Sequence, residues 1–504
     1  MLARVATFAL SALDPVRVTA EVDVRPGLPA FTLVGLGDVA VRESRERVRS
    51  ALLNSGFDFP LRRIVANLAP ASLKKAGPAF DAALAAALLA ASEQVPVGSL
   101  DGVAVFAELS LGGELRGCRG TLAAAEGARA SGIELLLVAE ERAGEAALVT
   151  GLKVGAIRDL QELAAVLSGN AEVRLARPAI DVAAVDSGLD LADVRGQPHA
   201  SRALEIAAAG SHNLLMEGPP GVGKTMLARR LPGLIPPLAG DEALEVTRIQ
   251  SVAGLFDGGG LVRQRPFRAP HHTVSPAGLV GGGSVPMPGE VTLAHRGVLF
   301  LDELSEFPRH SLDALRQPLE DGSVTVVRRS GAATFPARCT LVAATNPCPC
   351  GYAGQGSRCH CDQQAIDRHQ RRLSGPLVDR LDLLVALANP TGDQLRSSSS
   401  TSTAEVAGRV VAAHAQRNLR WPQSTIRSNA EAPEASLTDQ RCLSKEALEA
   451  VDAAYARGLV GLRGRVRVLR VARTIADLRE AGLTGVEDVL EALSMRLRVD
   501  GGTQ

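Results

Sequence analysis

The chain has 504 residues, of which 46% are hydrophobic and 22% charged, so it is long enough for about two to four domains and too apolar for disorder throughout. Lys plus Arg and Asp plus Glu both number 55, which excludes an overall basic charge as a sign of a nucleic-acid partner. No apolar run reaches the roughly 20 residues that span a bilayer, so we expect no membrane segment.

The first residues are apolar enough to resemble a short signal peptide, but no small-x-small cleavage site precedes a polar start. Residues 16–24 alternate between apolar and polar side chains, as a half-buried strand does. We therefore interpret the N-terminus as a strand and expect a cytoplasmic protein, in which disulfides are rare.

Residues 1–170 combine predicted strands with two predicted helices. One helix runs from Asp38 to Asn54, and an Ala-rich helix follows Gly77 and Pro78. This mixed order of elements predicts an α+β domain instead of a doubly wound sheet.

The remainder is expected to hold a linker at 171–190 and an α/β core at 191–395, where β-rich runs alternate with helices and glycine-rich loops. A serine-rich stretch at 397–405 predicts a flexible hinge over 396–435. Residues 436–504 have helical patterns, at 445–457, 463–480 and 485–498. The sequence thus predicts a multidomain α/β protein with a helical C-terminal domain.

A short apolar strand precedes a G-x-x-x-x-G-K-T motif, and a helical pattern follows it. The glycines allow backbone N–H groups to point at phosphate, and the helix N-terminus adds its dipole. Lys224 is expected to reach the β- and γ-phosphates of ATP, and Thr225 to bind Mg²⁺. The predicted nucleotide-binding residues are Gly218, Pro219, Pro220, Gly221, Val222, Gly223, Lys224 and Thr225.

Residues 297–303 read GVLFLDE, which predicts a buried parallel strand that ends in two carboxylates. Asp302 is expected to hold the Mg²⁺, and Glu303 to polarise the attacking water. Such a string is weak evidence alone, because it also ends ordinary strands, but it gains weight downstream of a phosphate-binding loop.

Two further residues suit ATP hydrolysis. Asn346 ends an apolar run, where it would orient the attacking water or simply begin an Asn-Pro turn. Arg380 suits an arginine finger that stabilises transition-state charge from a neighbouring subunit. The other interpretation of Arg380 is a solvated arginine beside Asp379 or Asp382.

Four of the seven cysteines lie in the loop 346–361, namely Cys348, Cys350, Cys359 and Cys361. Redox pairs usually have two intervening residues, whereas these form two C-x-C pairs. Two such pairs can place four thiolates around Zn²⁺, although the one-residue spacer is tighter than usual. His360 and His369 are possible substitute ligands, and an inert loop is the alternative. We predict a closed, structural zinc site that braces the segment between Asn346 and Arg380.

On these motifs the chain resembles the AAA+ ATPases of the magnesium-chelatase-like group, and specifically the ComM/YifB family, over nearly its whole length. The most specific passages are FRAPHHTVSPAGLVGGGSVPMPGEVTLAHRGVLFLDELSEFP, LNSGFDFPLRRIVANLAPASLKK and LRVARTIADL. The resemblance implies a P-loop ATPase core with a helical lid, and a ring that usually has six subunits. It implies that Asn346 is sensor 1 and Arg380 the finger. It further implies a sensor-2 arginine in the lid, which we place at Arg463 with Arg473 as the alternative, and an adenine-contacting loop at 192–197.

Residues 1–170 are similar to the ribosomal-S5-like fold that also houses the Lon protease. Lon-type domains carry Gly-Pro-Ser before an Ala-rich helix, whereas this chain has Ala79 at the serine position. Without an oxygen nucleophile no acyl-enzyme forms, and Ser72 lies on the wrong side of the turn. We therefore predict a non-proteolytic domain that is structural or guides DNA.

The resemblance implies a ring motor that hydrolyses ATP and drives branch migration of DNA in recombination or natural transformation. Arginines cluster at 463–473 and 368–372, and such clusters either bind DNA phosphates or form ion pairs and solvated helix faces. The aromatic content is only 3%, so a grip by base stacking is not expected.

The alternative is a chelatase- or chaperone-type remodeller of a protein partner, which would use the same ATPase core. The sequence shows neither the long acidic linker nor the integrin-like metal-binding domain of a chelatase subunit. A nucleotide-gated binding platform would need a damaged acidic motif, and Asp302 and Glu303 are intact.

Overall fold

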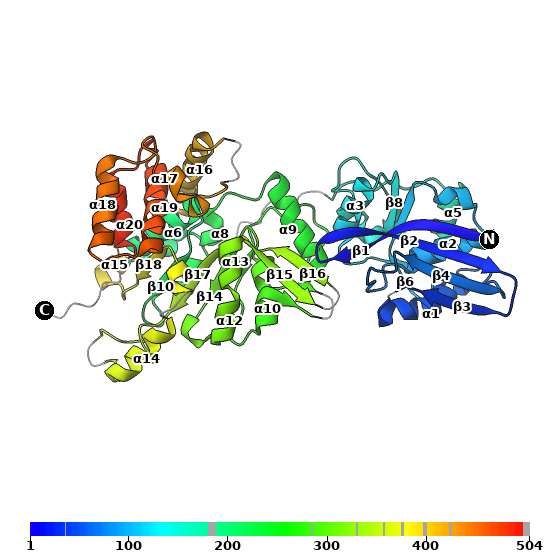
Figure 1. Ribbon diagram of the computed structural model, residues 1–504, viewed down its shortest axis with the longest axis horizontal. Coiled ribbons are helices and arrows are strands. Elements are labelled where there is room, and N and C mark those ends of the chain that lie inside the picture. The colour runs from blue at the N-terminus through cyan, green and yellow to red at the C-terminus, as the bar shows by residue number, and fades with distance from the viewer. Residues whose placement is uncertain are drawn as a thin grey trace.

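The computed structural model describes residues 1–35, 37–179, 188–283, 286–328, 331–355, 358–373, 377–396, 401–422 and 426–496. Figure 1 shows an elongated molecule with an N-terminal sheet domain at one end, a central core and a helical lid at the other. Within the described residues, no helix has both the length and the apolar character needed to cross a membrane.

The N-terminal domain is built on a seven-stranded sheet in the order β3-β4-β2-β1-β5-β8-β9. Strand β2 pairs antiparallel with β1 and β4, and the remaining neighbours pair in parallel. The predicted alternation in β2 is confirmed, since Val18, Ala20, Val22 and Val24 are buried. The strands are β1 Leu2–Ser11, β2 Asp14–Arg25, β3 Ala30–Val34, β4 Arg63–Ala69, β5 Val103–Phe106, β8 Leu135–Ala139 and β9 Lys153–Ile157.

Helices cover this sheet. Asp38 caps α1 (Val39–Asn54) by accepting a bond from Val41 N at 2.9 Å, and both predicted helices are confirmed. The Ala-rich α2 (Asp81–Ala91) packs on β1 and β2 and is buried on every side, because its small side chains admit close neighbours. The remaining elements are η1 Val97–Leu100, β6 Glu108–Leu109, β7 Leu115–Arg116, α3 Thr121–Ala130, α4 Glu140–Ala146 and α5 Leu160–Leu167. Of the predicted linker 171–190, residues 180–187 lie outside the described residues.

The core has a five-stranded sheet in the order β11-β14-β17-β10-β18, with every neighbouring pair parallel. Parallel strands bring their carboxyl ends to one edge, so the segments after β10, β14 and β17 meet there. The strands are β10 Leu214–Glu217, β11 Phe267–Arg268, β14 Val298–Leu301, β17 Thr340–Thr345 and β18 Leu383–Ala386.

Helices and two small hairpins surround the core sheet. They are η2 Leu191–Asp193, α6 Pro198–Gly210, α7 Lys224–Ala228, α8 Leu231–Leu234, α9 Gly240–Ala253, α10 Pro276–Val280, β12 Gly281–Gly282, β13 Met287–Pro288, α11 Glu290–Leu293, η3 Leu304–Glu306, α12 Arg309–Ala314, α13 Arg316–Asp321, β15 Ser323–Arg328, β16 Gly331–Pro336, α14 Gln363–Leu373, η5 Val378–Arg380 and α15 Gly392–Arg396.

The N-terminal domain and the core join where α3 packs against α9. Buried Glu145 accepts bonds from Leu122 N at 3.0 Å and from the hydroxyl of Ser251 on α9. Arg142 donates to the carbonyl of Phe256 at 2.9 Å. The bonds from Ser251 to Glu145 and from Arg142 to Phe256 cross between the two parts of the chain and fix one against the other.

The lid consists of α16 Thr403–Arg420, η6 Asn429–Glu431, α17 Glu434–Leu437, α18 Lys445–Ala456, α19 Leu462–Leu478 and α20 Val486–Ser494. The prediction of a flexible hinge over 396–435 missed α16, which Ser402 caps and which buries Val406, Val410 and Ala413. Residues 397–400 and 497–504 lie outside the described residues. The lid and core share one hydrophobic cluster, because α19 and α16 pack against α6.

Candidate functional site

The G-x-x-x-x-G-K-T motif forms the turn between β10 and α7, as the sequence predicts. Gly221 and Gly223 have φ of 79° and 98°, a left-handed conformation that glycine adopts without a Cβ penalty. A cavity of about 380 Å³ opens at this turn. Its lining residues are Pro220, Gly221, Val222, Gly223, Lys224, Thr225, Met226, Asp302, Glu303, Thr345 and Asn346.

Lys224 links the turn to the neighbouring strand. Its Nζ donates to the carbonyls of Gly218 at 2.5 Å and Pro219 at 3.0 Å, and to Oδ1 of Asn346 at 2.9 Å. An ammonium group has three N–H donors, and these acceptors match them. Burial lowers the pKa of Lys224, and the carboxylates of Asp302 and Glu303 oppose that effect.

The hydroxyl Oγ1 of Thr225 donates to Oδ2 of Asp302 at 2.8 Å. The two side chains come from α7 and from the end of β14, and oxygen atoms of this kind are the ligands that Mg²⁺ takes in nucleotide sites. The glycine turn, the lysine and this oxygen pair together fit a phosphate group with its magnesium ion.

Glu303 follows Asp302 in a left-handed backbone conformation, with φ of 52° and ψ of 51°. Such a conformation is strained for a residue with a side chain, and strain of this kind clusters at functional sites. The carboxylate is exposed and lies 3.7 Å from Nδ1 of His272. The sequence analysis did not predict a role for His272. The segment FRAPHHT, on which the family resemblance partly rests, contains this residue and could have indicated it.

Asn346 lies at the end of β17, beside the turn. Its side chain accepts the bond from Lys224, and its backbone carbonyl accepts one from Nε2 of His369 at 2.8 Å. His369 is buried on α14, its Nε2 is bonded to Asn346, and it is not part of the group of ligand atoms in which the cysteines converge. The suggestion that His369 replaces a cysteine ligand is therefore not supported.

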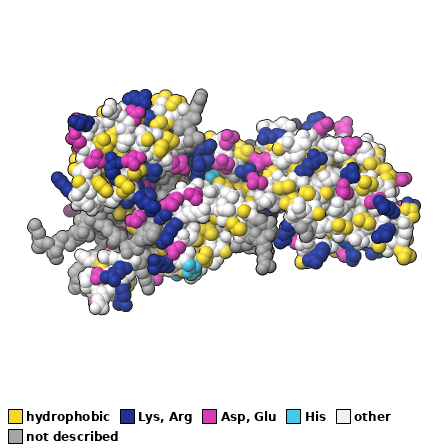
Figure 2. Space-filling view, viewed as in Figure 1, with side chains coloured by type: hydrophobic (Ala, Val, Ile, Leu, Met, Phe, Trp, Pro, Cys, Tyr) yellow, Lys and Arg dark blue, Asp and Glu magenta, His cyan; other side chains and the backbone are white. Residues whose placement is uncertain are grey.

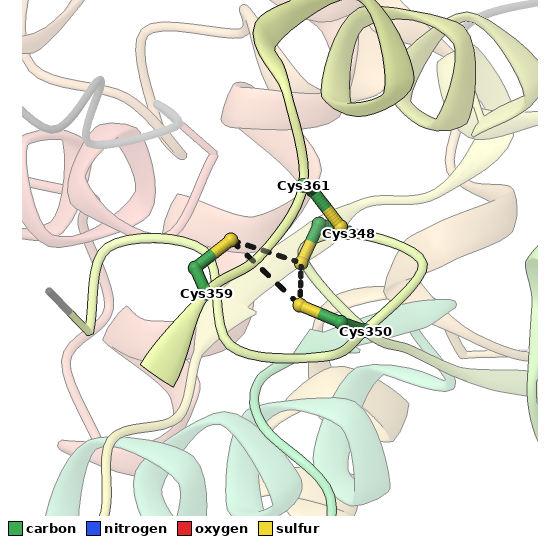
Figure 3. Close-up of side chains that lie close together, drawn as sticks. All are labelled: Cys348, Cys350, Cys359 and Cys361. Carbon is green, nitrogen blue, oxygen red and sulfur yellow. Dashed lines mark hydrogen bonds between the residues drawn. The ribbon is translucent and has the colours of Figure 1, made fainter. Parts of the chain in front are cut away.

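The four cysteines of the loop converge on one point, and we call them the cysteine cluster: Cys348, Cys350, Cys359 and Cys361 (Figure 3). Their sulfur atoms all lie within 4.8 Å of one another. Elsewhere, burial raises the pKa of the Cys118 and Cys339 thiols to about 12, so these thiols stay protonated and unreactive.

Arg380 does not line the cavity at the turn. It ends η5 at the amino end of β18, on the opposite edge of the sheet, and its Nη2 lies 2.5 Å from Oε1 of Glu320. Arg463 lines the same second cavity as Arg380, a space of about 780 Å³ between core and lid. The structure therefore brings the predicted finger and the predicted sensor-2 arginine together, away from the chain's own Lys224.

Arg473, the alternative sensor 2, is buried inside the lid. It pairs with Oδ1 of Asp477 at 2.9 Å and donates to the carbonyl of Cys442 at 3.1 Å. Arg465 and Arg467 of the same cluster pair with Asp452 and Asp382. Figure 2 shows basic and acidic side chains interspersed over the lid, as the ion-pair interpretation of this cluster requires.

The predicted adenine loop 192–197 overlaps η2 and lies beside the helix that follows the turn. Asp193 forms an ion pair with Arg230, the residue directly before α8, with 2.8 Å between Oδ2 and Nη2. Gln197 donates to the carbonyl of Ala388 at 2.7 Å, just after β18. These contacts hold the loop near the turn.

Family models described as magnesium chelatase, subunit ChlI, match residues 20–142 and 190–395, and the model of its C-terminal part matches 400–496. An uncharacterised protein of Mycobacterium tuberculosis is 44% identical over 497 residues, which cover 98% of both chains. The uncharacterised protein YifB of Escherichia coli is 42% identical over 488 residues, with 95% of this chain and 94% of the relative covered. The competence protein ComM of Haemophilus influenzae is 43% identical over 489 residues, with 96% and 95% covered.

Proposed function

The chain belongs to the ComM/YifB family of magnesium-chelatase-like AAA+ proteins, and we propose that it is an ATP-hydrolysing ring motor that acts on DNA. The observation that carries the proposal is the convergence of Lys224, the Thr225–Asp302 pair, Glu303 and Asn346 on one cavity. Each of these side chains has a defined task in phosphoryl transfer to water.

The chain's own residues divide the work. Backbone N–H groups of the glycine turn bind the phosphates, and so does Nζ of Lys224, where phosphate oxygens take the place of the Gly218 and Pro219 carbonyls as acceptors. The Thr225 hydroxyl and Asp302 carboxylate bind Mg²⁺. Bound Mg²⁺ neutralises charge on the phosphates. Glu303 accepts a proton from the attacking water at its carboxylate. Asn346 orients that water from the adjacent strand.

Arg380 acts on a neighbouring subunit in this proposal. The sheet separates it from the chain's own Lys224, so it serves a site presented by another copy. Arg463 lines the same cavity as Arg380, and we propose that it also acts on the nucleotide site of the neighbouring subunit. This division of labour requires a neighbouring copy of the chain, and we propose a closed ring of six subunits.

DNA is the proposed substrate because a relative covering nearly the whole chain carries the name competence protein ComM. We propose helicase or branch-migration activity in recombination or natural transformation. Helix α14 projects from the core (Figure 1) and carries exposed Arg368, which suits contact with DNA phosphates. The S5/Lon-like N-terminal domain is proposed to be non-proteolytic and to guide DNA.

The test is the ATP hydrolysis rate of the full chain without DNA, with single-stranded DNA and with forked DNA, at low and high salt. We expect both DNAs to stimulate hydrolysis, and salt to weaken the effect because phosphate contacts release counterions. Hydrolysis without DNA binding or stimulation at low salt would favour the alternative, a remodeller of a protein partner.

A further inference from the structure

We propose that the cysteine cluster binds one structural zinc ion, and that this ion fixes Asn346 and the loop after it against the phosphate-binding turn. The metal site rests on the geometry of the four sulfurs and on the groups around them. Its effect on hydrolysis rests on the proposed function.

The sulfur positions match a single tetrahedral ion. The Sγ of Cys348 lies 3.3 Å from that of Cys350 and 3.9 Å from that of Cys359, and Cys350 and Cys359 are 3.7 Å apart. With Zn–S bonds of about 2.3 Å, the edge of a regular tetrahedron is about 3.8 Å. A disulfide would require about 2.05 Å. A cluster of several irons would hold the sulfurs farther apart, since the irons lie between them.

The surroundings of the sulfurs also suit a thiolate site. The backbone N–H of Ala353 donates to Sγ of Cys348 at 3.2 Å, a bond that orients a metal ligand and stabilises its negative charge. Four thiolates complete the coordination of Zn²⁺ and leave no position open for water. The ion is therefore structural and takes no part in the chemistry.

The first cysteine pair packs against the phosphate-binding turn. Gly351 follows Cys350 with φ of 88°, and a Cβ added there would lie 2.6 Å from Cδ of Pro220. Pro220 lines the nucleotide cavity. The loop that holds the ion thus touches the turn directly, and only glycine permits this approach.

The second cysteine pair leads into α14, which returns to the site. Asp362 follows Cys361 and caps this helix by accepting a bond from Ala365 N at 2.7 Å. One turn before the helix ends, His369 donates to the carbonyl of Asn346. Helix α14 also packs against η3, which begins directly after Glu303. The ion therefore joins the two cysteine pairs. Through their contacts it links the phosphate-binding turn, Asn346 and the segment after Glu303.

The experiment measures zinc and hydrolysis on the full chain. Elemental analysis should find about one zinc per chain in the wild type. Cys350→Ser combined with Cys361→Ser should abolish zinc binding, and Cys442→Ser, which removes a buried thiol of the lid, should retain it. The double variant should bind ATP with nearly unchanged affinity and hydrolyse it about 100-fold more slowly, because a shift of about 1 Å in a positioning group has that cost.

If the double variant fails to fold, the same test is made on the wild-type protein. Its zinc is removed with a chelator, and Mg²⁺ is added back before hydrolysis is measured. Re-addition of zinc should then restore hydrolysis. A wild-type protein without zinc after incubation with zinc salts would overturn the metal site. Zinc loss with unchanged hydrolysis would overturn the link to Asn346. Bound zinc in a protein that never hydrolyses ATP would refute the proposed function and leave the metal site standing.

Discussion

Lys224 donates a hydrogen bond of 2.9 Å from Nζ to Oδ1 of Asn346, and this bond joins the phosphate-binding turn to the neighbouring strand. The pairing of the strands sets the distance. Glu217 of β10 is in register with Thr345 of β17, and Gly218 N donates to the carbonyl of Thr345 at 3.2 Å. The residues that follow the two strands therefore lie side by side, which places the Asn346 side chain against Nζ of Lys224.

Asn346→Ala should lower the rate of ATP hydrolysis by about 10²–10³-fold, because it removes one positioned polar group from the reaction. ATP affinity should change little, since Lys224 and the turn remain. Single-turnover kinetics and equilibrium binding separate the two effects. Asn418→Ala on the exposed side of α16 is the control, and an equal effect of both variants would contradict a role for Asn346.

Glu303→Gln should retain ATP binding and lower turnover by about 10²–10⁴-fold, since the amide cannot accept the proton of the attacking water. Mg²⁺ binding should persist through Thr225 and Asp302. Phosphate release and nucleotide binding are the measurements. Glu306→Gln changes an exposed carboxylate one helical turn away and should hydrolyse normally. Normal hydrolysis by Glu303→Gln would show that another residue activates the water.

Mixing Arg380→Ala chains with Lys224→Ala chains should recover part of the ATPase activity that each lacks alone. In a mixed ring, some interfaces join an intact Lys224 to an intact Arg380 of the neighbour. The measurement is the hydrolysis rate across mixing ratios. In the control, Arg441→Ala, which changes an exposed arginine of the lid, replaces Arg380→Ala. Failure at every ratio would mean that Arg380 supports its own chain.

Arg473→Met should destabilise the lid by about 1–3 kcal/mol, because buried Asp477 keeps Arg420 but loses its partner on the same helix, and the buried carbonyl of Cys442 loses a donor. Trp421 is the single tryptophan of the chain and adjoins the lid, so its fluorescence reports lid unfolding in urea. Arg441→Met, which breaks an exposed pair with Asp439, should leave the midpoint unchanged. Equal midpoints for both variants would contradict a structural role for Arg473.

Acidification should weaken the lid through His414. Burial, aided by Arg417 and Arg265, lowers its pKa from 6.5 to about 4. Between these values the unfolded chain binds a proton that the folded chain does not, so stability is full above about pH 6.5 and falls as the pH approaches 4. Urea unfolding of His414→Gln, followed by Trp421 fluorescence, should lose this part of the pH dependence. An unchanged profile would contradict the assignment.

Local patterns predicted which side chains meet at the glycine turn. A strand, a glycine turn and a helix are adjacent in sequence, and parallel pairing brings the ends of β14 and β17 beside them. The helix α16 was not predicted because the serine-rich stretch before it is typical of a flexible linker, although Val406, Val410 and Ala413 have helical spacing.

Tertiary packing decided what the sequence left open. Arg463 and Arg473 both fitted the sensor-2 position that the resemblance implies, and the packing of the lid leaves Arg463 exposed and Arg473 buried. His272 lies near Glu303 because of how the segment between them folds, and the periodicity of the sequence does not predict that fold. The convergence of the cysteine pairs likewise depends on how the loop closes.

The most direct test of the motor is the movement of a branch point in a labelled three-strand DNA substrate, measured with ATP for the wild type and Glu303→Gln. A DNA motor predicts displacement of the labelled strand by the wild type at a rate that follows ATP hydrolysis, and none by Glu303→Gln. ATP hydrolysis by the wild type without any displacement would contradict the account.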